Sequence, residues 1–463
     1  MIPQPLTHSL ANTLLTLLAT PASKAPSKLT DLAALALERA KALGATSAEV
    51  EVSTSVGQNV TVRLGEVETI EHNRDKGLSM TVYIGQHTGN ASTSDLSPAA
   101  IERTVAAALA IAKYTAEDEC AGLADASRLA KAPFNDLAIY QPWKLSVADA
   151  IAFAKEMEAA AFAVDKRLDN SDGASVSTSE SDFIYANSLG FMGGYPTTRH
   201  SASATMIASD KNGMQRDYWY AVAREESGLE SAAAIGRRAG ERTVARLGAR
   251  KAPSGEFPVL YEATMAAGLI HAYVNAVSGA ALRRRASFLM DSMGQQILSP
   301  IVSILEDPYL ARGLASGPFD NEGVTTARRE VVKAGVVAGY FLGSYSARKL
   351  GLETTGNAGG AHNLIVTPGA LDFAALVKKM HRGFIVTELM GSGVNGVTGD
   401  YSRGAAGFWV ENGEIAYAVE ETTIAGNMKD MLKGIIAIGN DVLALGSISC
   451  GSILVDKLSI AGE

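Results

Sequence analysis

The chain has 463 residues, of which 47% are apolar and 19% charged, and its net charge is −8. This length exceeds the roughly 250–300 residues at which one core stops growing, so two or more domains are expected. The acidic balance argues against direct nucleic-acid binding, which needs concentrated Lys and Arg. No uninterrupted apolar run approaches about 20 residues, so no membrane span is expected.

Residues 1–29 are predicted to form a flexible N-terminal extension. They include a short apolar stretch at 14–19, but no Lys or Arg precedes it, which argues against a secretory signal. The two cysteines, Cys120 and Cys450, are too few for a disulfide framework. A reducing cytoplasm is therefore the expected location.

Residues 30–250 are predicted to form a domain of antiparallel strands and helices. Apolar residues alternate between positions 48 and 94, and a turn-like Asn-Arg-Asp-Lys-Gly segment at 73–77 divides the predicted meander. Further strand-like segments lie between 175 and 223, with turns at 188–190 and 211–213. Helices are expected at 32–43, after a Thr30–Asp31 cap, and at 98–114, 147–164 and 232–247.

Residues 251–463 are predicted to form a second domain, because the Lys-Ala-Pro-Ser-Gly segment at 251–255 interrupts the regular pattern. Many glycines separate short β-rich segments here, which indicates a β-rich C-terminal domain of barrel or sandwich type. The clearest hairpin is expected at 410–414, where Asn412 and Gly413 separate apolar strands. The fold class is therefore α+β.

A predicted helix around His271 resembles the zinc-binding helix of a hydrolase, but it lacks the glutamate and the second histidine of such a helix. Such a helix needs a glutamate beside the first histidine and a second histidine about one turn later. Here Ala272 follows His271, and no His, Cys, Asp or Glu appears before Asp291. The helical period predicts one buried apolar stripe and one polar face with His271, Asn275 and Ser278. That face either lines a cavity or contains a hydrogen-bonded structural histidine.

Other zinc ligands are hard to find in the sequence. No two of the seven histidines lie closer than fifteen residues, and a site built from His271 and Cys450 would lack a third ligand. Cys450 alone is typical of a buried residue. The run Arg283, Arg284 and Arg285 is typical of a solvated helix C-terminus, and the alternative is an anchor for an acidic group.

The GSGVNG run at 391–396 matches the glycine pattern of a dinucleotide-binding loop. A strand-like segment follows it rather than a helix, which argues against nucleotide binding. The alternative to a purely structural loop is a substrate-cavity wall. Its candidates are Gly391, Gly393, Asn395, Thr398, Asp400, Tyr401 and Arg403.

Two other segments resemble catalytic motifs without satisfying them. GSYSA at 343–347 lacks the last glycine of a serine-hydrolase elbow. The acidic segment at 320–323 could serve acid–base chemistry, but a polar turn is favoured because it follows Gly317 and Pro318.

Several longer segments resemble the PmbA (TldE) branch of the TldD/PmbA family. The most specific are SGPFDNEGV at 316–324 and DYSRGAAGFWVENGE at 400–414, and YVNAVSGAALRRR at 273–285 and SCGSILVDKLSIAG at 449–462 agree with them. The resemblance covers nearly everything after about Leu29.

This resemblance implies an intracellular bacterial peptidase of two homologous subunits, historically linked to modulation of DNA gyrase. In the TldD branch, an H-E-x-x-x-H motif and a C-terminal-domain cysteine hold the metal. Carried onto this chain, the first histidine corresponds to His271, the glutamate to Ala272 and the second histidine to Ala276, while Cys450 corresponds to the cysteine. The chain therefore departs from the catalytic pattern.

The resemblance predicts a non-catalytic subunit that holds no metal and pairs with a zinc-bearing, TldD-like homologue. Together they would degrade unfolded peptides and trim precursor leaders such as that of a microcin. One alternative is a peptide-binding or regulatory homodimer without a peptidase partner. Another is a hydrolase that uses other residues.

Overall fold

The computed structural model describes residues 27–462. Most of the predicted extension at 1–29, including the apolar stretch at 14–19, lies outside the described residues. Residues 27–29 are helical, because the first helix, α1, spans Ser27–Ala42. The predicted cap at Thr30 was therefore placed too late. Leu29 is buried in the same core as Ala33 and Ala36, so the apolar face of the helix begins before the cap.

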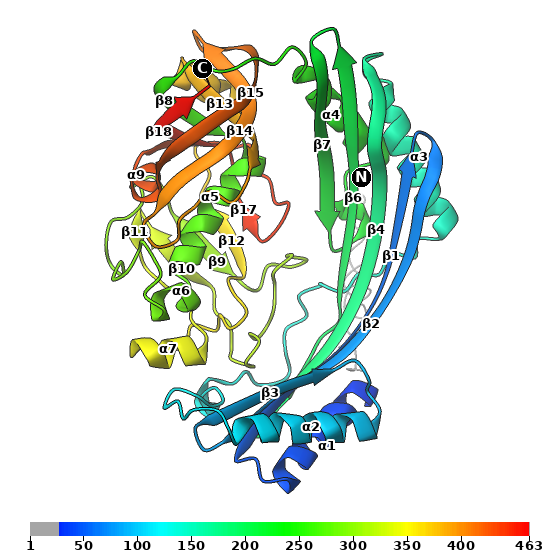
Figure 1. The fold of residues 1–463 in the computed structure, drawn as a ribbon, viewed down its shortest axis with the longest axis vertical. Helices are drawn as coiled ribbons and strands as arrows, with labels where there is room; N and C mark the ends of the chain where they lie inside the picture. Colours follow the sequence, from blue (N-terminus) through cyan, green and yellow to red (C-terminus); the bar gives the residue numbers. More distant parts are fainter. Residues whose placement is uncertain (1–26, 463) are drawn as a thin grey trace, which may run out of the picture.

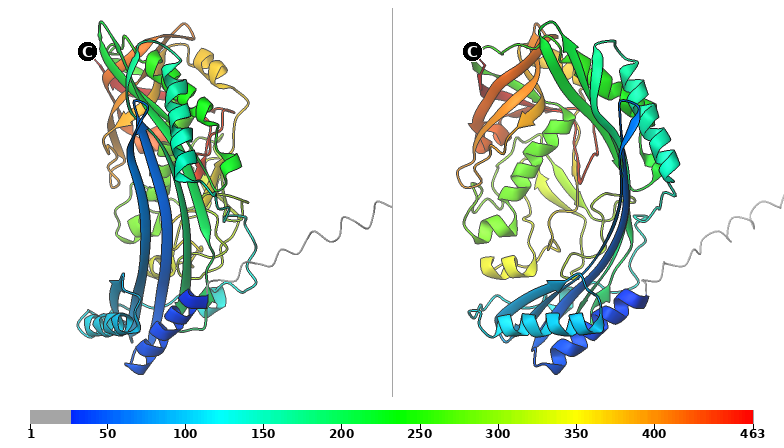
Figure 2. Two further views of the ribbon diagram at one scale, coloured as in Figure 1. Left: turned by 90° about the vertical axis from the view of Figure 1, so that its right-hand side faces the viewer. Right: turned by 45° about the vertical axis from the view of Figure 1, so that its right-hand side comes forward.

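The N-terminal half is built on a seven-stranded antiparallel sheet. Its order is β3-β2-β1-β4-β6-β7, with β5 beside β4. Figures 1 and 2 show that the long strands curve along one side of the molecule and face the C-terminal half. The strands are β1 (Ser47–Arg63), β2 (Glu66–Ile84), β3 (His87–Thr93), β4 (Leu168–Asn187), β5 (Met192–Gly193), β6 (Thr197–Asp210) and β7 (Gly213–Ala223).

The turn predicted at 73–77 is wrong, because β2 runs through this segment without interruption. Asn73 pairs with Gly57, and Gly77 pairs with Ser53. The chain reverses instead at Leu64 and Gly65, which both have positive φ angles of 51° and 77°. A neighbouring strand supplies hydrogen-bond partners along the whole polar segment, so pairing determines its conformation.

Two helix pairs cover different parts of this sheet and form two cores. α1 packs with α2 (Pro98–Ala112) near β3, while α3 (Val147–Phe162) packs with α4 (Ala232–Ala245) over β6 and β4. Three of these helices, α2, α3 and α4, have serine N-caps, whose side chains accept hydrogen bonds from backbone amides in the first turn. The expected helices at 98–114, 147–164 and 232–247 are confirmed within two residues at each end.

The α3–α4 contact depends on Gly236. A Cβ atom at this position would lie 1.8 Å from the carbonyl oxygen of Met157. The two helices can therefore approach closely only because residue 236 has no side chain.

The C-terminal half contains a closed five-stranded barrel, which confirms the barrel alternative. The barrel order is β15-β14-β13-β8-β18, and β15 closes it by pairing with β18. Asn412 and Gly413 connect β14 to β15 with positive φ angles of 53° and 77°, as predicted for an Asn-Gly hairpin. The strands are β8 (Gly255–Tyr261), β13 (Gly383–Met390), β14 (Asp400–Glu411), β15 (Glu414–Asn427) and β18 (Ile453–Ala461), with β16 (Ile435–Ile438) attached to β18.

A second, five-stranded sheet lies below the barrel in Figure 1, in the order β11-β10-β9-β12-β17. Its strands are β9 (Ile304–Asp307), β10 (Arg329–Lys333), β11 (Val336–Val337), β12 (Asn363–Val366) and β17 (Ile448–Ser449). The helices of this half are α5 (Ala263–Ala276), α6 (Gly279–Arg283), α7 (Ser344–Leu350), α8 (Phe373–Met380) and α9 (Met428–Lys433). Among the described residues, no helix has the length and apolarity needed to cross a membrane.

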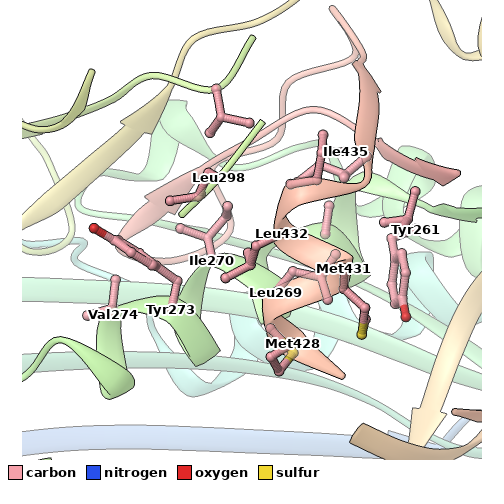
Figure 3. Close-up of a cluster of buried hydrophobic side chains, with 14 of the residues drawn as sticks. Tyr261, Leu269, Ile270, Tyr273, Val274, Leu298, Met428, Met431, Leu432 and Ile435 are labelled. Carbon is pink, nitrogen blue, oxygen red and sulfur yellow. The ribbon is translucent and has the colours of Figure 1, made fainter. Parts of the chain in front are cut away.

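Helix α5 packs one face into the core of the C-terminal half. Leu269, Ile270 and Tyr273 are buried beside the α9 residues Met428 and Leu432 (Figure 3). Burying each large apolar side chain contributes about 1.5–3 kcal/mol. The opposite face of α5 therefore has a fixed orientation. The predicted buried stripe is confirmed for Ala266, Leu269, Ile270, Tyr273, Val274 and Val277.

Candidate functional site

The polar face of α5 is the centre of the candidate site. His271 and Asn275 are exposed on this face. Ser278 follows the helix, and its hydroxyl accepts a hydrogen bond from the amide of Ala281 at the start of α6. The structure thus places all three residues of the predicted polar face beside open space.

Three cavities meet at His271. Their volumes are about 660, 300 and 730 Å³, and His271 lines each of them. Two further cavities adjoin these: one shares Glu322 and Tyr345 with the first, and the other shares Tyr220 with the second. The space around α5 therefore extends from the curved N-terminal sheet to the β14 side of the barrel.

The residues beside His271 do not fit a zinc site. Ala272 and Ala276 line the 730 Å³ cavity but offer no ligand atom from their side chains. Cys450 is fully buried, and its thiol donates to the carbonyl oxygen of Gly451 at 3.1 Å. Burial raises the pKa of this thiol to about 12, whereas a zinc ligand must be a thiolate. Within residues 27–462, no group of three or more His, Cys, Asp or Glu side chains could hold a metal.

The predicted cavity residues in the loop before β14 and at the start of β14 fall into two groups, those that line a cavity at His271 and those that do not. Gly391, Gly393 and Arg403 line the 730 Å³ cavity with His271. The loop glycine at 393 is required because a Cβ atom there would lie 1.6 Å from the carbonyl oxygen of Ser402.

The other four loop candidates, Asn395, Thr398, Asp400 and Tyr401, do not line the three cavities at His271. Asn395 accepts hydrogen bonds from the amides of residues 397 and 398, and Thr398 donates to Asp400 at 2.6 Å. Tyr401 is buried, with its hydroxyl 3.3 Å from that of Tyr261. These side chains stabilise the loop internally, because each has polar partners within the fold.

An acidic group faces the other side of the site and was not found from the sequence. Glu49 on β1 and Glu322 both line one cavity, together with Asp118. Burial raises the pKa of Glu49, although hydroxyl hydrogen bonds from Tyr185 at 2.7 Å and Tyr83 at 3.0 Å lower it in part. These carboxylates come from distant segments, so no local motif could have indicated the group.

The 320–323 segment is a turn, as favoured from the sequence. The Asp320 carboxylate accepts backbone hydrogen bonds from Glu322, Val324 and Ala358. Burial is the main cause that raises its pKa to about 6. The Glu322 carboxylate accepts from the amide of Ser344 at 2.8 Å, and this contact fixes its position between two cavities.

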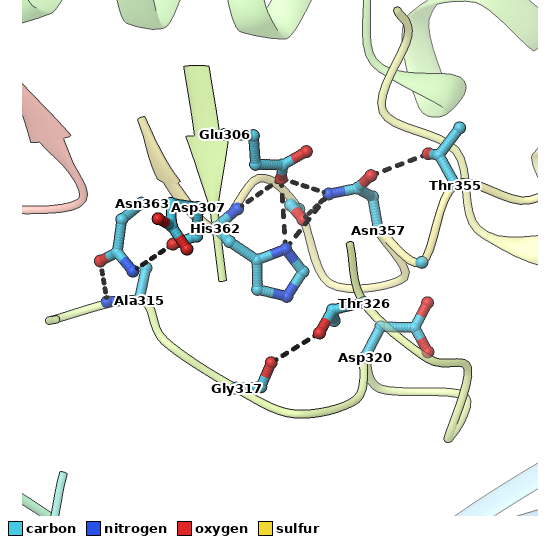
Figure 4. A network of polar contacts seen from close by, with 12 residues as sticks. Glu306, Asp307, Ala315, Gly317, Asp320, Thr326, Thr355, Asn357, His362 and Asn363 are labelled. Carbon is cyan, nitrogen blue, oxygen red and sulfur yellow. Dashed lines mark hydrogen bonds and ion pairs between the residues drawn. The ribbon is translucent and has the colours of Figure 1, made fainter. Parts of the chain in front are cut away.

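A buried polar network supports the wall of the 660 Å³ cavity (Figure 4). Glu306 accepts a hydrogen bond from Asn357 Nδ2 at 2.7 Å. It also accepts one from Arg329 Nε at 2.8 Å. It also lies 3.2 Å from His362 Nδ1. Burial tends to raise the pKa of Glu306, but the contacts with His362 and the charge of Arg329 outweigh this effect and lower it. Asn357 lines the cavity, so the network holds that wall in place.

Comparison with known proteins identifies the class to which this fold belongs. Family models for the PmbA/TldA metallopeptidases match domain 1 at residues 48–112, the central domain at 140–247 and the C-terminal domain at 254–462. The chain therefore belongs to the PmbA/TldD metallopeptidase family, which confirms the resemblance inferred from the sequence. The expected boundary between residues 250 and 251 falls after the second match, which ends at 247, and before the third, which begins at 254.

Curated relatives agree over most of the chain. Metalloprotease PmbA of Escherichia coli O157:H7 is 48% identical over 417 residues, which are 90% of this chain and 92% of the relative. A PmbA homologue of Haemophilus influenzae is 45% identical, with 94% and 96% covered. A TldD homologue from the same organism is 26% identical over 46% of this chain and 47% of its own length.

Solved structures show the same fold. A Bacteroides thetaiotaomicron protein described as a candidate modulator of DNA gyrase has a TM-score of 0.89 at 28% identity, covering 94% of this chain and 99% of that protein. TldE of Thermococcus kodakarensis has a TM-score of 0.79 at 18% identity, covering 94% of this chain and 99% of that protein. The latter comparison supports the fold alone.

Proposed function

We propose that this chain is the non-catalytic subunit of a two-subunit TldD/TldE-type zinc peptidase. A TldD-like homologue holds the zinc and performs the chemistry, while this chain stabilises it and completes a cavity for unfolded peptide. The proposal rests on the residues that surround His271. His271 lines three cavities, yet Ala272, Ala276 and the buried Cys450 supply no usable metal ligands.

The adjoining cavities support an unfolded substrate. The two largest cavities at His271 measure about 660 and 730 Å³, which suits a few residues of extended peptide rather than a folded domain. We extend the proposal to the degradation of unfolded peptides and to the trimming of precursor leaders of the microcin type. The two free, buried cysteines agree with a cytoplasmic setting.

The test compares cleavage of an unfolded peptide by this chain, by a TldD-like homologue and by an equimolar mixture. Zinc content and particle mass are measured on the same samples. We expect cleavage and zinc only where the homologue is present, and a mass that shows both chains in one complex. Metal-dependent cleavage by this chain alone would overturn the proposal. If this chain instead forms a homodimer that binds peptide but does not bind the homologue, the regulatory alternative is favoured.

A further inference from the structure

We propose that the 730 Å³ cavity beside His271 binds a carboxylate group of the peptide through Arg284 and Arg403. The inference rests on the proposed function, because it assigns one end of the same cavity system. Both arginines line this cavity, with Arg284 at the end of α6 and Arg403 on β14. They approach it from separate elements, so the cavity has two cationic walls.

Among the residues that the structure describes, no acidic side chain lines this cavity. The remaining polar side chains on its walls belong to His271, Asn275, Ser278 and Ser392. In contrast, Glu322 and Arg283 both line the 660 Å³ cavity, and Glu322 lines the next cavity together with Glu49 and Asp118. An anionic group is therefore favoured more in the 730 Å³ cavity than in the two cavities that Glu322 lines.

The two arginines are available for a ligand. Among residues 27–462, neither Arg284 nor Arg403 has a carboxylate within ion-pairing distance. Arg403 donates from Nη2 to the carbonyl oxygen of Gly391 at 2.5 Å, while its Nε is buried without an acceptor in the described part of the chain.

The chemistry of guanidinium groups favours a carboxylate. Their planar donors match the two oxygens of a carboxylate and form charge-assisted hydrogen bonds with them. Apolar atoms of Phe288 and Val394 line the same cavity, and they suit the aliphatic part of a peptide residue. The group could be the C-terminal carboxylate or an acidic side chain, because both present the same atoms.

Three peptides of one sequence separate these sources: a free acid, a C-terminal amide and an amide whose last residue is replaced by Glu. Binding is measured by fluorescence anisotropy with this chain alone and with its TldD-like homologue. We expect the free acid to bind about tenfold to a hundredfold more tightly than the plain amide, as charge-assisted hydrogen bonds allow. Recovery of affinity by the Glu-containing amide would assign the site to acidic side chains as well.

Arg284→Gln and Arg285→Gln are the matched variants. Both residues are exposed at the end of α6 and lose the same charge, but only Arg284 lines the cavity. We expect Arg284→Gln to abolish the preference for the free acid and Arg285→Gln to retain it. Arg403→Lys, which keeps the charge but loses the planar donors, should weaken the preference.

Three results overturn the inference. Equal binding of the three peptides, or equal loss in Arg284→Gln and Arg285→Gln, removes the carboxylate site but leaves peptide binding intact. Failure of all three peptides to bind, with or without the homologue, removes the proposed function as well.

Discussion

Arg242 Nη1 lies 2.8 Å from a carboxylate oxygen of Glu262, and this ion pair joins α4 to the residue that precedes α5. Arg242 also approaches Asp217 on β7 at 3.5 Å. Arg246, the C-cap residue of α4, lies 2.5 Å from Glu388 on β13. The helix that carries His271 is therefore tied at its first turn to the N-terminal sheet.

Replacing Arg242 with Gln should destabilise the protein by about 2–3 kcal/mol. The side chains of Arg242 and Glu262 are only 15% and 19% exposed, so the variant leaves the poorly solvated Glu262 without its cation. Asp217 loses one of its two arginine partners and keeps Arg246 at 3.8 Å. Urea unfolding measures the difference. Arg237→Gln, an exposed change on the same helix, should stay within about 0.5 kcal/mol of the parent. Equal stability of the two variants would show that the ion pair contributes nothing.

Replacing each of two helical glycines with alanine should change the stability of the protein in opposite directions. Gly236→Ala places a methyl group 1.8 Å from the Met157 carbonyl oxygen, and we expect a loss of about 2 kcal/mol or more. Gly268 lies inside α5 with nothing within 4 Å of its ideal Cβ, so Gly268→Ala should stabilise the helix by up to about 1 kcal/mol. Thermal unfolding of both variants checks the pair, and a stabilising Gly236→Ala would contradict the close α3–α4 packing.

Titration of Asp320 should lower the free energy of unfolding as pH rises between about 4 and 6. Its pKa is raised from 3.8 to about 6 in the folded protein, so the folded state holds a proton that the unfolded state releases first. This contribution is present below pH 4 and is lost as pH passes 6, with a span of about 3 kcal/mol.

Urea unfolding at several pH values between 4 and 7 measures the Asp320 effect. Asp320→Asn cannot titrate, so its unfolding free energy should lack this component of the slope. The variant also loses the acceptor for the Ala358 amide and should be less stable throughout. Parallel pH profiles for the parent and the variant would rule out Asp320 as the titrating group.

Cys450 should resist thiol reagents until the protein unfolds. Its side chain is fully buried, and a pKa of about 12 instead of 9.0 lowers the thiolate fraction about a thousandfold near neutral pH. Labelling of a Cys120→Ala variant isolates Cys450, and labelling in urea gives the full count. Fast labelling of the folded variant would contradict the buried position and reopen a metal-binding role.

Periodicity and capping explain which parts of the structure were predictable from the sequence. The helices at 147–162 and 232–245 begin at serine caps, and their apolar residues recur with a helical period. The same period placed His271 on the open face of α5. The 73–77 segment has turn-like composition, but its conformation depends on the ladder with β1. Likewise, Glu49 and Glu322 meet at one cavity only after the two halves of the chain come together.

We expect His271 to line the cavities without taking part in the reaction. His271→Ala enlarges the junction of the three cavities, so we expect the mixture with a TldD-like homologue to retain its cleavage rate within about twofold. His271→Trp fills the junction and should lower the rate about tenfold or more, because peptide must pass this point. Since His271 is exposed, both variants should fold, and circular dichroism checks this requirement. A large loss in His271→Ala, with zinc content and assembly unchanged, would instead assign the imidazole a direct role in the reaction.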